Sequence, residues 1–255
     1  MPAGIGREFM EKTRYRHMAP SDQSRQAAEP TAFWSLPADA PRLPLPPPAS
    51  VALAPLDLLD LVTRRRSLRR FAAAPLSLPE LSFLLWCTQG LKQTEPVRAF
   101  RTVPSAGARH AFETFLLTNR VTGVAAGLHA YDPREHALVQ LPAPADIAER
   151  VAQACLGQQF LTQCAAALAW VAVPYRMTWR YGERSYRYLH LDAGHVCQNL
   201  YLAAEAIGAG ACAVGAFDDD ALSAVLELDP KEAFPIYLAA VGKREGGSQL
   251  AVHST

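Results

Sequence analysis

The sequence predicts an α+β fold, in which helices and strands follow one another in mixed order. Residues 167–173 form a continuous apolar run of strand length, which is typical of a strand covered on both faces. Residues 196–207 carry apolar side chains at helical spacing, and Gly208 marks the end of that helix. Because the segments do not alternate strictly as β-α-β units, a doubly wound parallel sheet is not favoured.

Local signals place the remaining elements. A helix after Pro55 carries an apolar stripe and ends at the basic run at 64–66. Ser77 and Glu80 have the spacing of a capping box and predict a helix that runs to Gly90. Further helices are predicted over 147–155 and after a cap at Asp218 or Asp219, and further strands over 112–118, 128–131, 212–217 and 234–241.

The first fifty residues are predicted to form an extended N-terminal arm, and residues 51–255 the main domain. Prolines fix the backbone and remove donors, which favours an extended, irregular chain; they stand at Pro41, Pro44, Pro46, Pro47 and Pro48. Four aromatic side chains argue against a purely solvated tail, namely Phe9, Tyr15, Phe33 and Trp34. We expect the arm to pack on its own body or on a second subunit.

Composition excludes several classes of function. Half of the 255 residues are apolar, and the formal net charge is +1, so nucleic acid and anionic membranes are not expected partners. The five cysteines include no CxxC pair, so no metal site is expected. The longest apolar run, 164–173, is too short to cross a bilayer, and no signal peptide is recognisable. These features lead us to expect a soluble cytoplasmic protein.

Two loop-like segments could bind a ligand. Residues 64–71 read Arg-Arg-Arg-Ser-Leu-Arg-Arg-Phe, and guanidinium groups around a hydroxyl could surround a phosphate. The alternative is a solvated basic turn. Residues 104–110 read Pro-Ser-Ala-Gly-Ala-Arg-His, and their small side chains could let the backbone approach a flat ligand. The alternative is a tight surface turn.

Two other motifs are ambiguous. Residues 208–213 imitate a dinucleotide-binding glycine motif, but a helix precedes them and a strand follows, which is the reverse of the order that motif needs. We therefore reject a Rossmann site. Residues 180–188 gather three tyrosines and three arginines. A tyrosine there could act as an acid or hydrogen-bond donor, although a polar dimer surface is equally typical of this composition.

Taken together, these segments resemble the SagB-type branch of the nitroreductase family, which includes azoline dehydrogenases of thiazole/oxazole-modified peptide pathways. The resemblance covers most of the chain and rests on the order and spacing of its parts. They are residues 6–15 and 21–23 in the arm, then 65–71, 78–90, 104–110, 186–198, 208–217 and 241–243.

The resemblance implies a central, mostly antiparallel sheet flanked by helices, and FMN held at the interface of an intertwined homodimer. Residues 51–255 would then be the FMN-binding domain. By position, the phosphate and ribityl chain would be bound by Arg65, Arg66, Ser67 and Arg69, and Lys243 and Arg244 would return to the phosphate. The partner subunit would line the flavin with Ser105, Ala106 and Gly107, and amides near N5 and O4 would come from Val214, Gly215 and Ala216.

The implied chemistry is hydride transfer through flavin N5, with the protein supplying orientation and electrostatics. In related azoline dehydrogenases a Lys-Tyr pair is implicated in proton removal, and the matching positions here are Arg180 and Tyr181. Arginine stays protonated, so Arg180 cannot be the base. Either Tyr181 serves, or the reaction needs no such base and Arg180 holds an anionic or carbonyl group.

Three functions remain open from the sequence. The first is a SagB-type dehydrogenase of a heterocyclic or peptide-derived substrate. The second is an NAD(P)H-dependent nitro or quinone reductase on the same fold. It is favoured by Arg180, which stands where the related azoline dehydrogenases have a lysine. The third is a non-catalytic flavin-binding or scaffold subunit.

Overall fold

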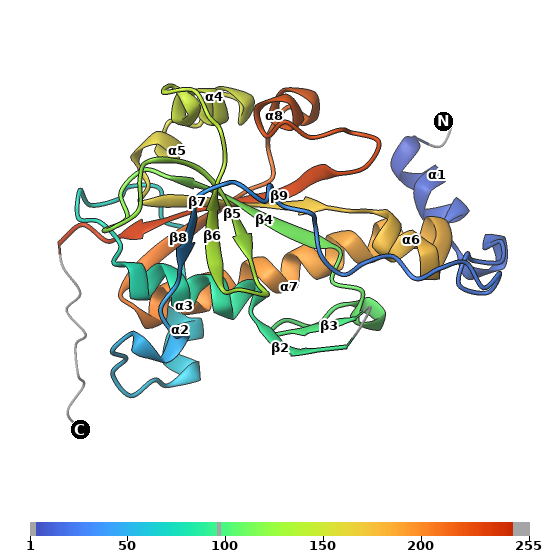
Figure 1. Cartoon of the computed structure of the whole chain (residues 1–255), viewed down its shortest axis with the longest axis horizontal. Coiled ribbons are helices and arrows are strands. Elements are labelled where there is room, and N and C mark those ends of the chain that lie inside the picture. Colours follow the sequence, from blue (N-terminus) through green and yellow to red (C-terminus); the bar gives the residue numbers. More distant parts are fainter. Residues whose placement is uncertain (1–3, 96–97, 247–255) are drawn as a thin grey trace.

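A seven-stranded antiparallel sheet forms the centre of the molecule (Figure 1). The structure is a computed structural model that describes residues 4–95 and 98–246. The strands follow the order β1-β6-β5-β4-β7-β9-β8, and each neighbouring pair runs antiparallel. Their bounds are β1 Arg42–Pro44, β4 Phe112–Thr118, β5 Gly127–Asp132, β6 Ala137–Gln140, β7 Ala166–Ala172, β8 Ala209–Val214 and β9 Phe234–Lys243. A separate hairpin joins β2 Leu91–Thr94 to β3 Ala99–Arg101.

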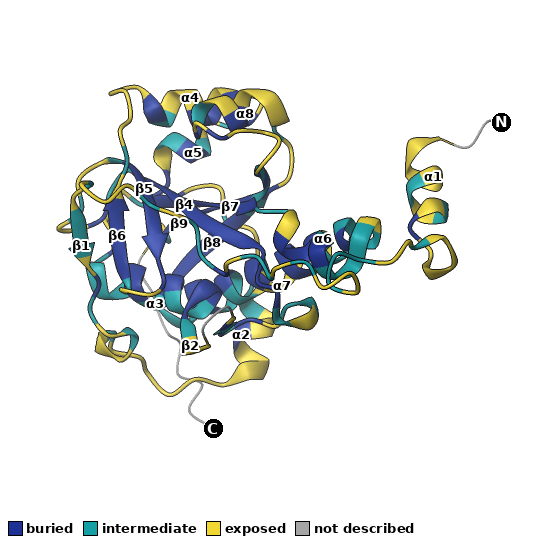
Figure 2. Ribbon diagram, turned by 45° about the vertical axis from the view of Figure 1, so that its right-hand side comes forward, coloured by how far each residue is buried: buried dark blue, intermediate teal, exposed yellow. Residues whose placement is uncertain are grey.

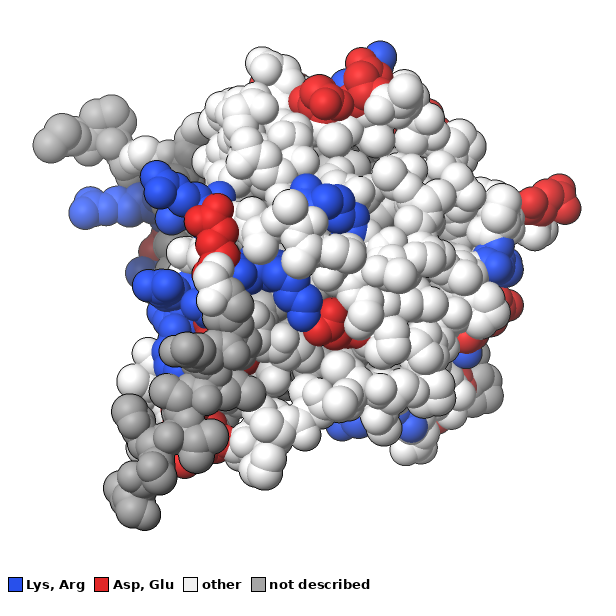
Figure 3. Space-filling model, turned by 90° about the vertical axis from the view of Figure 1, so that its left-hand side faces the viewer, with Lys and Arg blue, Asp and Glu red and all other residues white. Residues whose placement is uncertain are grey.

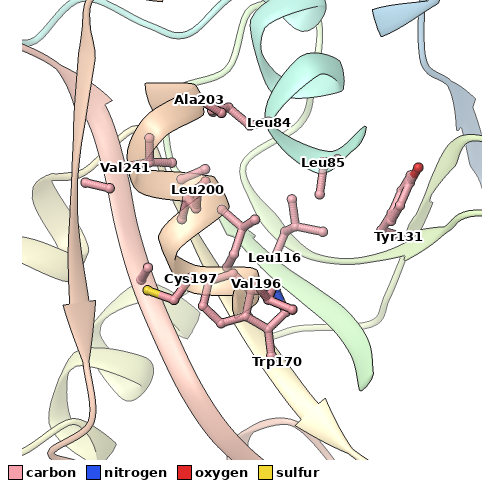
Figure 4. Packing of buried hydrophobic residues seen from close by; sticks show 14 of the residues in the cluster. Leu84, Leu85, Leu116, Tyr131, Trp170, Val196, Cys197, Leu200, Ala203 and Val241 are labelled. Atoms are coloured by element: carbon pink, nitrogen blue, oxygen red, sulfur yellow. The ribbon is translucent and has the colours of Figure 1, made fainter. Parts of the chain in front are cut away.

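Helices cover both faces of the sheet, which confirms the predicted α+β class (Figure 1). One face carries α2 Leu58–Arg64, α3 Leu78–Gln89 and α7 Ser185–Ala206, and the other carries α4 Ile147–Ala154, α5 Phe160–Gln163 and α8 Asp219–Val225. Figure 4 shows side chains of α7 lying between α3 and the sheet, where they meet Leu116 and Trp170. The 22-residue helix α7 is therefore the main contact between these layers.

Local capping explains where two helices begin. Ser77 and Glu80 form the predicted capping box of α3: the Glu80 amide donates to Ser77 Oγ at 3.3 Å, and the Ser77 amide donates to the Glu80 carboxylate at 2.8 Å. Asp218 accepts from the Ala221 amide at 2.8 Å and caps α8. Both predictions are confirmed.

The arm is mostly irregular but contains two elements that its proline content did not predict. Helix α1, Ile5–Lys12, buries none of its residues and projects beside the body (Figure 2). Strand β1 pairs with β6 and forms an edge of the central sheet. The stretch between them is attached through hydrogen bonds to helix α6, Tyr175–Tyr181, including the Gln23 amide to Trp179 O at 2.8 Å. The arm therefore packs on its own body over most of its length.

Two predicted elements differ in extent. The strand predicted over 212–217 is β8, Ala209–Val214, because the turn at Gly208 (φ 66°) leads directly into the sheet and Gly215 leaves it. The helix expected over 196–207 begins eleven residues earlier at Ser185, so it includes the Tyr186–Tyr188 stretch. Within the described residues, no helix is both long and apolar enough to span a membrane.

Candidate active site

The basic segment after α2 lies along the free edge of β8. Ser67 forms a parallel bridge with Ala211, and the Leu68 amide donates to Ala211 O at 2.8 Å. Further on, the Ala72 amide donates to Lys243 O of β9 at 2.9 Å. The structure therefore brings the arginines at 65–69 and Lys243 to one edge of the sheet.

Two glycines in the strands allow this close approach. A Cβ on Gly210 would stand 2.7 Å from Leu68 Cδ2, and a Cβ on Gly242 would stand 2.9 Å from Phe71 Cδ1. Such separations are shorter than side chains tolerate, so the segment could not lie this close to the sheet if either glycine carried a side chain. Within residues 208–213, Gly210 is therefore explained by the close packing of Leu68 against β8.

Tyr201 of α7 connects the basic segment to β8, and the sequence analysis missed it. Its hydroxyl lies 2.9 Å from Ser67 Oγ and accepts a hydrogen bond from the Ala213 amide at 2.8 Å. The Arg65 guanidinium lies 5.3 Å from the centre of the Tyr201 ring, which is within the range of a cation–π contact. Tyr201 therefore fixes Arg65 and Ser67 relative to the end of β8.

The end of β8 opens into a cavity of about 530 Å³. Gly215 lines it together with His190 and Gly194 of α7 and Tyr237 of β9. The Gly215 and Ala216 amides follow the last residue of β8 that pairs with β9, and no hydrogen bond joins either amide to another part of the described chain. Burial raises the pKa of Tyr237 to about 12, so its hydroxyl stays protonated. The cavity wall thus offers amide and hydroxyl donors.

The cations at this sheet edge differ in how they are paired. Lys243 contacts the Glu80 carboxylate, and Arg244 contacts the Glu205 carboxylate and donates to Ala209 O at 3.0 Å. Within residues 4–95 and 98–246, Arg66 and Arg69 have no carboxylate partner and are exposed. Figure 3 shows Lys and Arg side chains gathered on this side of the molecule. Arg66 and Arg69 therefore supply uncompensated positive charge, whereas Lys243 and Arg244 are already neutralised.

The loop at 104–110 is fixed to the opposite side of α7. The Ser105 hydroxyl donates to Asp192 Oδ2 at 2.6 Å, and the Ala106 amide donates to the same oxygen at 3.2 Å. Burial raises the pKa of the Asp192 carboxyl, although these two hydrogen bonds act in the opposite direction. The Ser105 oxygen also accepts from the His110 amide at 2.9 Å. Asp192 therefore holds the loop in place, and the Ser105 hydroxyl donates its proton to Asp192.

The same loop contacts Arg180 and Tyr181 of α6. Gly107 has a positive φ of 59°, and a Cβ there would stand 2.4 Å from the Tyr181 hydroxyl and 3.2 Å from Arg180 Nε. Ala108 and His110 also have positive φ, at 52° and 43°, and such conformations cost energy for residues other than glycine. The structure therefore joins Ser105–Gly107 with Arg180 and Tyr181, but in a strained loop apart from the basic segment.

The two groups of predicted site residues lie on opposite sides of α7. Asp192, which holds the loop, and Tyr201, which holds the basic segment, are nine residues apart. In an α-helix that spacing corresponds to about half a turn of rotation and about 13.5 Å along the axis. Leu191 and His195, which are exposed, lie on the helix surface between them. In a single chain, the predicted site residues therefore form two separate groups.

Asp192 could have been found from the sequence. It lies three residues after Leu189 and four before Val196, both buried, so a carboxylate occupies a position where the periodicity predicts an apolar side chain. Tyr201 follows the periodic Leu200 and gave no comparable signal. Among the described residues, no group of three His, Cys, Asp or Glu side chains could hold a metal.

Comparisons with known proteins identify the family of the chain. The model of the Nitroreductase family matches residues 62–243. A candidate nitroreductase of Methanocaldococcus jannaschii is 36% identical over 190 residues, which cover 74% of this chain and 92% of that protein. The trifolitoxin-processing protein TfxB of Rhizobium leguminosarum bv. trifolii is 30% identical over 134 residues, which cover 51% of this chain but only 36% of TfxB.

Solved structures show the same fold. A candidate nitroreductase from Ralstonia eutropha superposes with a TM-score of 0.67 at 27% identity and covers 86% of this chain and 99% of that one. A nitroreductase-like protein from Desulfovibrio desulfuricans, solved in complex with FMN, has a TM-score of 0.52 at 16% identity over 78% of this chain and 95% of that one. A chain of the Escherichia coli microcin synthetase McbBCD complex has a TM-score of 0.59 at 20% identity over 76% and 75%.

Proposed function

The chain belongs to the nitroreductase family, and on that premise we propose that it is an FMN-dependent oxidoreductase. The observation that carries the proposal is that residues 65–69, with the exposed Arg66 and Arg69, lie along the edge of β8, the strand that is followed by Gly215 in the wall of the cavity. A flavin nucleotide needs cationic groups for its phosphate and a slot with amide donors for its ring system. The Desulfovibrio relative was solved with FMN bound.

The residues present fit such a nucleotide. Arg66 and Arg69 would hold the phosphate, with Arg65 and Ser67 toward the ribityl chain, because the arginines carry uncompensated charge and Tyr201 orders Ser67. The amides of Gly215 and Ala216, after Val214, would donate to the ring system. Lys243 and Arg244 would contribute hydrogen bonds rather than net charge, since Glu80 and Glu205 pair with them.

The bound flavin would supply the site for hydride transfer, and the chain would supply orientation and proton handling. The Tyr181 hydroxyl is the acid or base that we assign, because Arg180 beside it stays protonated. The contact with Gly107 fixes where that hydroxyl lies. Ser105 and Ala106 hold the loop through Asp192, so Tyr181 has a rigid support.

We infer that the site is completed by a second copy of this chain. The half-site with Arg180 and Tyr181 lies across α7 from the half-site with Arg66 and Gly215, so one chain cannot close around a flavin. Apolar side chains are exposed nearby, which is typical of an interface. They are Leu58, Leu59 and Val62 on α2, 66%, 74% and 51% exposed, and Leu191 on α7, 60% exposed. A homodimer would cover them and join complementary half-sites.

The preferred substrate class is a heterocyclic or peptide-derived compound that is oxidised, as in SagB-type dehydrogenases. The SagB-like segments support this choice, and so does the similarity to TfxB, whose name assigns it to trifolitoxin processing. The alternative is an NAD(P)H-dependent nitro or quinone reductase. Arg180 in place of a lysine favours this alternative, because it removes a potential base. A flavin-binding or scaffold subunit without turnover is the third function.

Spectroscopy of purified protein tests the proposal. We expect a yellow protein whose absorbance and released cofactor are those of FMN, at about one FMN per chain. Protein that remains colourless after incubation with FMN would rule out the flavin enzyme and leave the scaffold subunit. With flavin present, a loss of two hydrogens from azoline-containing peptides supports the dehydrogenase, whereas bleaching by NAD(P)H without peptide oxidation supports the reductase.

A further inference from the structure

Three arginines gather where the end of α6 meets the start of α7. Arg180 lies in the last turn of α6, Arg184 in the 3₁₀ turn Gly182–Arg184, and Arg187 in the first turn of α7. Tyr181 and Tyr188 lie among them, with ring centres 4.9 Å apart in an edge-to-face arrangement. The cluster borders Gly107, so it belongs to the half-site that carries the proposed acid or base.

The cluster has no counter-ion of its own among the described residues. Two buried arginines elsewhere each meet a carboxylate: Arg109 meets Glu29, and Arg176 meets Glu113 at 2.6 Å. Buried Arg101 instead donates to Gln89 and forms no ion pair among the described residues. Arg180, Arg184 and Arg187 form no ion pair within residues 4–95 and 98–246. Glu183 is exposed and forms none, and the carboxylates of α1 pair with cations of the arm itself.

Two of the three arginines donate hydrogen bonds to uncharged groups of the arm. Arg184 donates to Thr13 O and to the Tyr188 hydroxyl, both at 2.9 Å, and its guanidinium lies 4.2 Å from the Tyr15 ring centre. Arg187 donates to Thr13 Oγ1 at 2.6 Å and also contacts Met10 O. These contacts hold the two side chains in place and leave their positive charge uncompensated.

A hydrogen bond connects Tyr188 of the cluster to Tyr15 of the arm. The Tyr15 hydroxyl lies 2.7 Å from that of Tyr188. The pKa of Tyr15 is lowered, first by this hydrogen bond and then by Arg184. A phenol becomes more acidic when its anionic form is stabilised. Burial raises the pKa of Tyr188, the other member of this pair, so the arginines, rather than the tyrosines, provide the site for an anion.

Arg180 is the member of the cluster whose guanidinium remains available. It forms no hydrogen bond within the described residues and lies 5.4 Å from the Tyr181 ring centre, beside Gly107. A guanidinium presents a planar set of donors that matches the two oxygens of a carboxylate. The Tyr181 hydroxyl also lies beside Gly107, so a carboxylate bound by Arg180 would place the substrate next to the proposed acid or base.

We propose that Arg180 is the specificity-determining residue for a carboxylate on the substrate, which its guanidinium binds beside Tyr181. Arg184 and Arg187 raise the local positive potential, and the arm holds them there. The substrate class is an acid, such as a peptide-derived compound with a free carboxylate near the reacting ring. This inference rests on the proposed function, since it names the substrate class for the same half-site.

The test compares benzoate with benzamide, which have similar shapes and differ in charge. Calorimetric titration of purified protein, with its flavin content measured, gives both dissociation constants. We expect benzoate to bind at least about tenfold more tightly than benzamide at low salt, and Arg180→Gln to reduce that ratio to near one. Arg180→Lys keeps the charge and should retain part of the preference. Arg150→Gln removes an exposed arginine of α4 and should behave as wild type.

Equal affinity for the two probes in the wild type, or a preference that survives in Arg180→Gln, overturns the inference. Circular dichroism of each variant separates a lost site from a lost fold, and Arg180→Lys provides the comparison if the glutamine variant is unstable. The flavin measurement keeps the two proposals apart. Flavin-free protein that prefers benzoate contradicts the proposed function alone, whereas flavin-loaded protein without that preference contradicts this inference alone.

Discussion

Gly107 is the residue whose side chain, or lack of one, most directly sets the position of the proposed acid or base. An alanine there would have φ near 59° and a methyl group 2.4 Å from the Tyr181 hydroxyl. We expect Gly107→Ala to destabilise the fold by about 1–2 kcal/mol through the backbone and to reduce turnover by displacing Tyr181. Thermal unfolding and steady-state kinetics measure the two effects.

Gly123→Ala is the matched control, because Gly123 also has a positive φ, 79°, but a Cβ there meets nothing within 4 Å. This variant should lose similar stability and keep wild-type turnover. If both variants slow turnover equally, the contact with Tyr181 has no part in activity.

Arg66 and Arg69 are the residues on which phosphate binding depends in our proposal. Each hydrogen bond to a charged group contributes about 1.5–3 kcal/mol. We therefore expect Arg66→Ala with Arg69→Ala to weaken FMN binding at least about 100-fold and to leave the fold intact. Fluorescence titration of the apoprotein with FMN measures the affinity. The double variant Arg150→Ala with Lys231→Ala removes the same charge from exposed sites elsewhere and should bind FMN normally.

At the scale of elements, the strained loop ends at a histidine whose ionisation reports on the fold. Burial lowers the pKa of His110 from 6.5 to about 3, and the positive charge of nearby Arg101 is the second cause of this shift. Between these values the unfolded chain binds a proton that the folded chain does not, so stability falls as the pH is lowered. Each pH unit in that window corresponds to about 1.4 kcal/mol at most.

Chemical denaturation from pH 7 to pH 4 measures this effect in the wild type and in His110→Asn, since asparagine tolerates the positive φ of 43°. The difference in stability between the two proteins should shrink steadily as the pH falls. Parallel curves for the two proteins would mean that His110 protonates equally well in the folded state.

Elements with strong local signals were predictable from the sequence, whereas those defined by tertiary contacts were not. The capping box at Ser77 and the cap at Asp218 each determine a helix start through neighbouring atoms. Strand β1, by contrast, is three residues long and exists because β6 offers a free edge. The end of β8 at Val214 is likewise set by its pairing with Leu238 of β9.

The same distinction applies to the site. The arginine-rich and glycine-rich stretches could be selected from sequence because their composition is unusual, and the structure brings 65–69 to β8 and Gly107 to Tyr181. Asp192 and Tyr201 act by holding these stretches on opposite sides of α7. That role depends on the direction in which a helix presents each residue to distant loops, which local composition does not encode.

At the scale of the whole molecule, the exposed apolar residues predict an assembly. A glutamate at Leu191, which is 60% exposed between the half-sites, would place a charge within the proposed interface. We expect Leu191→Glu to shift the protein from dimer to monomer and to release FMN. Leu156→Glu, at a position 66% exposed on the other face of the sheet, should remain dimeric. Light scattering after size exclusion distinguishes these outcomes, and a monomeric wild type would contradict the assembly.

Mixing two defective chains tests whether each flavin is shared between subunits. One chain carries Arg66→Ala with Arg69→Ala, and the other carries Arg180→Gln with Tyr181→Phe. If the half-sites come from different chains, a mixed dimer contains one site with all four changes and one site with none. Co-expressed chains, purified through two different tags, should therefore bind FMN and turn over at up to about half the wild-type rate per dimer.

If each chain instead built a complete site alone, every site in the mixed dimer would carry one pair of changes. Its activity would then be no higher than the average of the two parent proteins. The separation of Asp192 and Tyr201 by half a turn of α7 makes the first outcome the expected one. Recovery of activity on mixing is a result that improved folding of either parent cannot produce, because each parent dimer is assayed separately under the same conditions.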